Sequence, residues 1–512
     1  MWSDVRINKR KLFSEGVTSY FSIPRFENAE KIDLSRCWFS KHQWYDILTQ
    51  IVNCGHTIEE LNLAEAQLQD VQLELFGEAI CKARRVNVAR VQIQSLDWEN
   101  VFRKLARSNT IRQLDLSDNF LALIPSDLFV TTLANLEEVE LKDALITNEQ
   151  LQALISRSKD TKTKLSVNII CENVHESPVH LPSAFFQLQK ISLCLEDYTD
   201  LTAARWSAVL RSVVMSPVLE EVSVEGVSVD LCGVEPLLLA ASLARLDRLR
   251  LSGVQLTEDQ WRLLLARLSS SHLSLRMVNM TSVDGSLLSR SLAGLASLSL
   301  EYAALTQQQW ESLLSSCHLA ASLSVLKISH INLSHVPAHI MASLTLSCSY
   351  LDLSNTGLLP HQLEELLTVL PRSSVIRDLS LQGLDLSALE DNLVARAAVH
   401  LVRVSLRKTK LTTKQTTALF IANLGRSKLK VLDLCNVNLS GVDSDVAALS
   451  LTRFREVDLS CTWLTKDQIV RLAHQVSKFT KLEFLKLQYA TASLLSQDMK
   501  QTLRKNLKLV IS

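Results

Sequence analysis

The side chains best suited to metal chemistry are two pairs of histidines. His175 and His180 flank a glutamate, as zinc-protease ligands do, but they are five residues apart with a proline between them. Ligands on one helical face need a spacing of four, and proline interrupts a helix. His335 and His339 have that spacing, but a proline separates them too. We therefore predict no metal site and no cofactor.

Nucleophiles are also poorly placed for catalysis. The segment 226–230 (GVSVD) misses the nucleophile-elbow pattern at its last place. The ten cysteines are spread singly, without CxxC pairs, which is typical of reduced, buried thiols in the cytoplasm or nucleus. One catalytic alternative stays open, a GTPase-activating role, which needs an exposed arginine beside a bound nucleotide. Its candidates are Arg36, Arg90 and Arg112.

Composition narrows the classes of partner. The chain has 54 basic and 54 acidic residues, and this balance argues against nucleic acid, which attracts a basic surplus. The opening MWSDVRINKRKLF lacks the apolar run of a secretory signal. The most apolar stretch, 237–243, is far shorter than the roughly 18 residues that a membrane span needs. We expect a cytoplasmic or nuclear chain with no membrane partner.

The elements that would carry a binding surface come from a repeated strand pattern. Between Leu323 and Leu487, each copy sets apolar residues at its first, fourth, sixth and usually eleventh places. The sixth-place residues are Ile328, Leu353, Leu381, Leu406, Leu434, Leu459 and Leu487. Their spacing alternates between about 25 and 28 residues. One copy cannot bury its own apolar face, so the copies must stack into a solenoid.

Earlier copies extend the array toward the N-terminus. Their sixth places are Leu34, Leu63, Val88, Leu116, Leu141, Ile169, Leu193, Val224, Leu251 and Leu300, with an ambiguous copy near Met277. We predict an N-terminal cap over residues 1–29 and a solenoid over 30–512, with about 18 turns and a terminal half-strand. The repeat pattern is interrupted near 158–185 and 272–285. These segments are either ordinary loops or a hinge or protrusion that serves a partner.

The copies are of two types. The longer type continues L-T-x-x-Q, as at Thr412–Gln415, which is the pattern of a helix capping box. A hydrophobic staple, such as Leu305 with Trp310, strengthens the prediction of a helix. The shorter type, as at 439–442, lacks the glutamine and predicts a shorter helix or a 3₁₀ turn. The fold class is α/β: a right-handed horseshoe solenoid with a parallel inner sheet and outer helices of alternating length.

The strand signature followed by a capped helix resembles the leucine-rich-repeat superfamily, and more closely its ribonuclease-inhibitor-like group, over residues 30–512. The group includes ribonuclease inhibitors, Ran GTPase-activating proteins, F-box substrate receptors and the sensing ends of nucleotide-binding immune receptors. This sequence departs at the ninth place, where Asn119 keeps the usual asparagine but most copies carry Ala, Val, Ile, Leu or Thr. An apolar spine is therefore expected in place of an asparagine ladder.

The inner face is where the resemblance implies that a partner binds. We predict a non-catalytic, monomeric protein-binding module, acting as a scaffold, inhibitor or substrate-recognition subunit. The alternatives are a Ran-type GTPase activator and the sensing region of an immune receptor. The predicted partner-binding residues are Arg36, Glu65, Asp118, Glu138, Glu140, Asp143, Glu225, Tyr302, His330, Arg407, Lys408 and Tyr489. Their charge changes from acidic to more basic along the chain, which would set the register of a protein partner.

Overall fold

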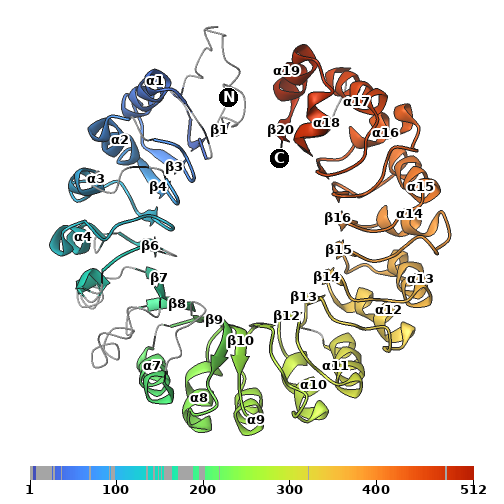
Figure 1. Cartoon of the computed structure of the whole chain (residues 1–512), viewed down its shortest axis with the longest axis horizontal. Helices are drawn as coiled ribbons and strands as arrows, with labels where there is room; N and C mark the ends of the chain where they lie inside the picture. Colours follow the sequence, from blue (N-terminus) through green and yellow to red (C-terminus); the bar gives the residue numbers. More distant parts are fainter. Residues whose placement is uncertain are drawn as a thin grey trace. The chain divides into compact units, whose positions relative to one another are not determined.

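The computed structural model shows a chain of alternating strands and helices (Figure 1). It describes residues 4–6, 26, 29–35, 37, 39–68, 71–91, 93, 98–133, 136–141, 144–147, 149–151, 153–154, 164–170, 188–194, 202–217, 219–320, 322–478 and 481–511. Most of the predicted cap and of the irregular segment 158–185 lies outside these residues. Two compact units divide the chain, Met1–Leu249 and Arg250–Ser512.

In the first unit, the strands pair in parallel, each with the next. They are β1 (Asp4–Arg6), β2 (Lys31–Asp33), β3 (Ile58–Asn62), β4 (Ala83–Asn87), β5 (Gln113–Asp115), β6 (Glu138–Leu141), β7 (Lys164–Ile170), β8 (Leu188–Cys194) and β9 (Glu221–Asp230). The described helices are α1 (Lys41–Val52), α2 (Leu73–Ile80), α3 (Trp98–Leu105), α4 (Ser126–Leu133), α7 (Ala203–Met215) and α8 (Pro236–Leu243). β10 (Arg248–Gln255) contains the boundary between the units.

The second unit repeats this arrangement. Its strands are β11 (His272–Arg276), β12 (Ser297–Glu301), β13 (Val325–Ser329), β14 (Tyr350–Asp352), β15 (Asp378–Ser380), β16 (Arg403–Ser405), β17 (Val431–Asp433), β18 (Glu456–Leu459), β19 (Phe484–Leu487) and β20 (Lys508–Ile511). Its helices are α9 (Glu258–Ala266), α10 (Gly285–Ala293), α11 (Gln307–Leu319), α12 (Ala338–Ser347), α13 (Pro360–Val369), α14 (Leu393–Ala398), α15 (Thr413–Leu424), α16 (Ser444–Leu451), α17 (Lys466–Lys478), α18 (Tyr489–Ser493) and α19 (Gln497–Asn506), with the 3₁₀ turn η4 (Leu370–Arg372). From β11 to β20, each strand pairs in parallel with the next.

Leucines at the repeat places form the core of each unit. The sixth-place residues Leu116, Leu300 and Leu434 are fully buried, and their fourth-place neighbours Leu298 and Leu432 are too. In each unit, strands lie along one side and helices along the other (Figure 1), so these side chains fill the space between the two layers. The predicted α/β class with a parallel sheet is therefore confirmed.

The structure differs from the sequence-based expectation at two places. The ambiguous copy near Met277 has Leu275 at its sixth place, because Leu275 lies opposite Leu300 in the pairing of β11 with β12. Segment 272–285 is thus a regular strand and turn. At the end of β9, Val227 is 70% exposed rather than part of a buried spine, because the strand runs on to Asp230 and buries Val229 instead.

The predicted capping boxes form. Thr412 Oγ1 accepts from the Gln415 amide, and Gln415 Oε1 accepts from the Thr412 amide. Ser40, Thr147, Thr257, Thr306 and Thr465 do the same with their glutamines. The stapling residue Trp310 is buried, as predicted.

These glutamines also join neighbouring repeats. Gln468 Nε2 donates to the carbonyl oxygens of Leu439 and Val442, each at 2.7 Å, on the turn of the preceding short repeat. The same two bonds recur at Gln150, Gln309, Gln362 and Gln415. A long repeat thus supplies the donor, and a short repeat supplies two buried acceptors. This pairing gives a physical reason for the alternation.

Helix length alternates in the last repeats but not throughout, since the short-type helix α12 and the long-type helix α13 both have 10 residues. The long-type helix α15 has 12 residues and the short-type helix α14 has six. The short repeats carry α-helices rather than 3₁₀ turns, as α16 and α12 also show.

Polar side chains at the ninth place form hydrogen bonds with the backbone in two ways. Asn119 is buried and donates to the carbonyls of Val88 and Leu116. At Thr356, Thr409 and Thr462, the hydroxyl donates instead to the sixth-place carbonyl of its own repeat.

Candidate functional site

Most described strands lead into the same left-handed turn, whereas β9 runs on to Asp230 and β19 is followed by helix α18. The residue at the eighth place, two after the buried sixth-place residue, has a φ of 51° at Tyr302, 59° at His330 and 55° at Lys408. Glycine occupies this place at Gly253 and Gly383, where a positive φ carries no steric penalty. For other residues this conformation costs roughly 1–2 kcal/mol. The turn therefore holds the eighth-place side chains in one fixed row on each unit.

An aromatic pair stands out in the second unit. The rings of Tyr302 and His330 are stacked, with centroids 4.4 Å apart and planes at 14°. Met277 precedes them in the turn after β11, and Asn355 follows in the turn after β14 with its Nδ2 3.4 Å from His330 Nε2. Tyr302 is 46% exposed and Met277 41% exposed. We call these four residues the aromatic row.

The other predicted residues are dispersed. Glu65, Asp118 and Lys408 occupy eighth places like the aromatic row. Asp118 forms an ion pair with Arg90 at 3.4 Å. Glu140 and Arg407 are half-buried. Among the predicted residues, the ring stack brings Tyr302 and His330 against each other.

Five predicted residues remain, and the structure describes three of them. Glu138 accepts from Gln113 at 2.8 Å, and Glu225 accepts from Ser223 at 2.6 Å. Arg36 and Asp143 lie outside the described residues. Tyr489 begins helix α18 instead of occupying a turn after a strand.

Of the three arginines of the GTPase-activating alternative, Arg90 and Arg112 are described, and both are engaged by carboxylates. Arg112 donates to Glu137 at 2.7 Å, and Arg90 pairs with Asp118. Sequence reasoning did not single out Arg84 and Arg85, which line a pocket with Arg112 in the first unit. Their position at the second and third places of a strand was the signal that could have found them.

Neither metal nor membrane chemistry is indicated by the described part of the chain. It holds no group of three or more His, Cys, Asp or Glu side chains suited to a metal ion. The pair His175 and His180 lies outside it. Nor does any helix in that part have the length and apolar character to cross a membrane.

The described cysteines are free thiols. Burial raises the pKa of Cys317 to about 12, with a further contribution from Cys348. Burial also raises the pKa of Cys348 to about 11. These two thiols stay protonated at neutral pH, so they are core residues rather than nucleophiles.

The parallel strands, buried leucines and alternating capped helices define a leucine-rich-repeat solenoid. No protein-family model matches the chain, and no curated protein does. Among solved structures, the chain is similar to the crystal structure of a TLR13–ssRNA13 complex, with a TM-score of 0.46 and 16% sequence identity. That similarity covers 91% of this chain and 82% of the other.

Proposed function

We propose that the chain is a non-catalytic module that binds a protein through the aromatic row of its second unit. The observation that carries this proposal is the stacked, exposed ring pair of Tyr302 and His330, with Met277 in the same row. Large side chains occupy the left-handed turn at three successive strands, where glycine would be more stable. The same conformation recurs at other eighth places, such as Arg90 and Lys408, so the stacked rings are what distinguish this row.

The chemistry of the row suits a protein surface. Tyr302 and His330 present flat apolar rings with polar edges, and tyrosine is enriched among the residues that dominate binding energy. Met277 adds a flexible side chain that can adapt to a partner. Because the turn fixes the backbone and the stack fixes the rings, little side-chain freedom remains to be lost on binding.

The finer assignments belong to the same proposal. The alternation of long and short helices supports the ribonuclease-inhibitor-like group, and we propose a scaffold, inhibitor or substrate-recognition role. We further propose a monomer in the cytoplasm or nucleus, with residues 1–29 as a cap on the solenoid 30–512. The balanced charge of the whole chain supports a protein partner rather than nucleic acid.

Glycine substitutions give a sharp test, because they remove a side chain and keep the left-handed turn. The full chain is used to capture partners from its native cells, alongside Tyr302→Gly/His330→Gly and the control Lys408→Gly. We expect a protein that is captured by the wild type and the control but lost from the double variant. Equal capture by all three would contradict the site. Release of the captured protein by nuclease would contradict a direct protein partner.

A further inference from the structure

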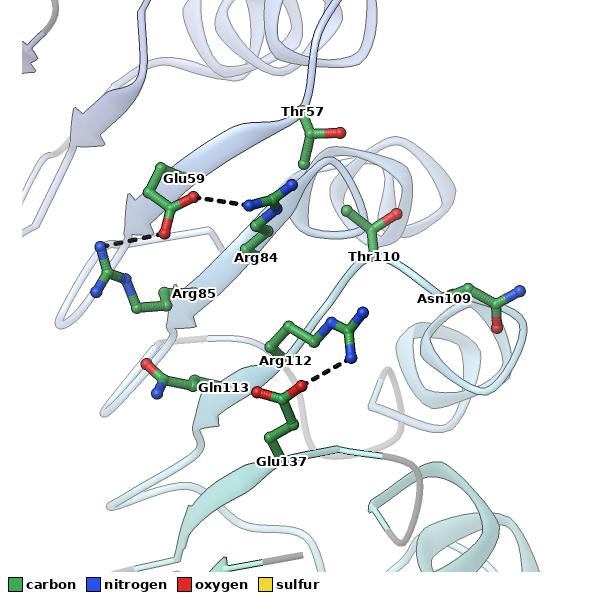
Figure 2. A pocket seen from close by; sticks show the side chains of 9 residues that line it. All are labelled: Thr57, Glu59, Arg84, Arg85, Asn109, Thr110, Arg112, Gln113 and Glu137. Carbon is green, nitrogen blue, oxygen red and sulfur yellow. Dashed lines mark hydrogen bonds and ion pairs between the residues drawn. The ribbon is translucent and has the colours of Figure 1, made fainter.

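A pocket in the first unit carries an unusual order of charges. Its volume is about 570 Å³, and residues of strands β3 to β5 and of their preceding loops line it together with Glu137 (Figure 2). Along the second places of β3, β4 and β5 and just before β6, the order is Glu59, Arg84, Arg112 and Glu137. Two arginines thus stand side by side on neighbouring strands, with a carboxylate beyond each.

The arginine side chains keep unused hydrogen-bonding capacity. Arg84 contacts Glu59 at 3.5 Å and Arg85 contacts it at 3.4 Å, both longer than a good charged hydrogen bond. Only Arg112 makes a short bond, at 2.7 Å to Glu137. Exposed ion pairs of this kind contribute little stability. In addition, Arg85 Nε is buried and has no hydrogen-bond partner among the described residues.

The guanidinium groups of Arg84 and Arg112 lie on neighbouring repeats and carry the same charge. Like charges on directly neighbouring strands destabilise a sheet, and Figure 2 shows both glutamates at the outer sides of the two arginines. Gln113 and Thr110 add an amide and a hydroxyl to the lining. The two guanidinium groups of Arg84 and Arg112, with the Thr110 hydroxyl, match a tetrahedral group with three acceptor oxygens and about two negative charges, whereas Arg85 points away across Glu59.

We propose that this pocket binds a phosphate monoester group, held between Arg84 and Arg112. The volume leaves room for the residue or small molecule that carries the phosphate. This site lies wholly within the first unit, and it does not depend on the protein-binding role of the aromatic row.

The binding test uses small anions and the full chain. Inorganic phosphate and O-phosphoserine are titrated at constant ionic strength by isothermal calorimetry, with acetate as the carboxylate probe. We expect saturable binding of both phosphates, and a loss of about tenfold or more in Arg84→Gln/Arg112→Gln. The control Arg103→Gln removes an exposed arginine on α3 that pairs with Glu99, and it should bind as the wild type does.

A gain of affinity separates this site from damage to the fold. Glu137→Gln removes the carboxylate that competes for Arg112, so we expect phosphate to bind several-fold more tightly. Misfolding cannot produce that result. The proposal is overturned if phosphate binds equally to wild type and Arg84→Gln/Arg112→Gln, if Glu137→Gln gives no gain, or if acetate binds as tightly as O-phosphoserine.

Discussion

Tyr302 and His330 occupy the same place in successive repeats and stack face to face, with ring centroids 4.4 Å apart. Both backbones have a positive φ. The strands that carry them, β12 and β13, pair in register, so the distance between the turns is set by the sheet and not by the rings. The stack is therefore preformed before any partner arrives.

A double-mutant cycle measures that stack. Tyr302→Gly and His330→Gly each remove one ring while relieving the left-handed turn, so each alone should change stability little. We expect a coupling of about 0.5–1.5 kcal/mol between them, measured by urea unfolding. If the two effects simply add, the rings do not stabilise each other.

The second prediction concerns the glutamine that joins repeats. In Gln468→Glu, the new carboxylate faces the Leu439 and Val442 carbonyl oxygens and cannot donate, which should lower the free energy of unfolding by about 2–4 kcal/mol at pH 7. Because these acceptors favour the protonated acid, its folded pKa rises above the unfolded value of about 4.3. The loss of unfolding free energy should reach its full size above the folded pKa and should shrink as pH falls through that pKa.

Urea midpoints between pH 4 and pH 8 test this prediction. Gln307→Ala serves as the control, since Gln307 bonds only the exposed Glu311 side chain among the contacts described for it. It should cost less than about 0.5 kcal/mol at every pH. A loss in Gln468→Glu that does not vary with pH would show that the donated bonds are not the cause.

The third prediction uses the left-handed turn at Lys408. Lys408→Gly should raise the free energy of unfolding by up to about 1 kcal/mol, because relief of the turn exceeds the added chain entropy. Lys408→Val should lower it, since a β-branched residue resists a positive φ. In the matched control Arg407→Gly, at the neighbouring place, the free energy of unfolding should fall by about 0.5–1 kcal/mol. Equal effects of both glycines on the urea midpoint would refute the argument.

The fourth prediction concerns alkaline pH. Burial raises the folded pKa of Cys317 to about 12 and of Cys348 to about 11, above the value of about 8.5 for an exposed thiol. The unfolded chain therefore loses these protons first as pH rises. Stability should be unaffected below about pH 8.5 and should fall between there and the folded pKa values.

Urea unfolding from pH 8 to pH 10.5 shows the effect. The free energy of unfolding should fall less steeply with pH in Cys348→Ala than in the wild type. Cys461→Ala, at an exposed thiol, should leave this pH dependence unchanged. Labelling of the native chain with iodoacetamide at pH 8 should reach Cys461 well before Cys317. Identical slopes in all three proteins would contradict the assignment to buried thiols.

The sequence by itself determined the repeat and most of its local structure. The spacing of leucines such as Leu353 and Leu434 predicted which side chains are buried, because one strand has a fixed alternation of faces. The Thr412–Gln415 pattern predicted a helix start, because a capping box is complete within four residues. These features depend only on neighbours along the chain.

Only the tertiary structure decided what neighbouring repeats do to each other. The stack of Tyr302 on His330, the bonds from Gln468 to the preceding repeat and the adjacent arginines Arg84 and Arg112 all join residues about 25 to 29 positions apart. Such contacts depend on the register between strands, which a one-residue change in repeat length would shift. The spacing of apolar residues left the register of the repeat near Met277 ambiguous. The pairing of β11 with β12 shows that Leu275 occupies its sixth place.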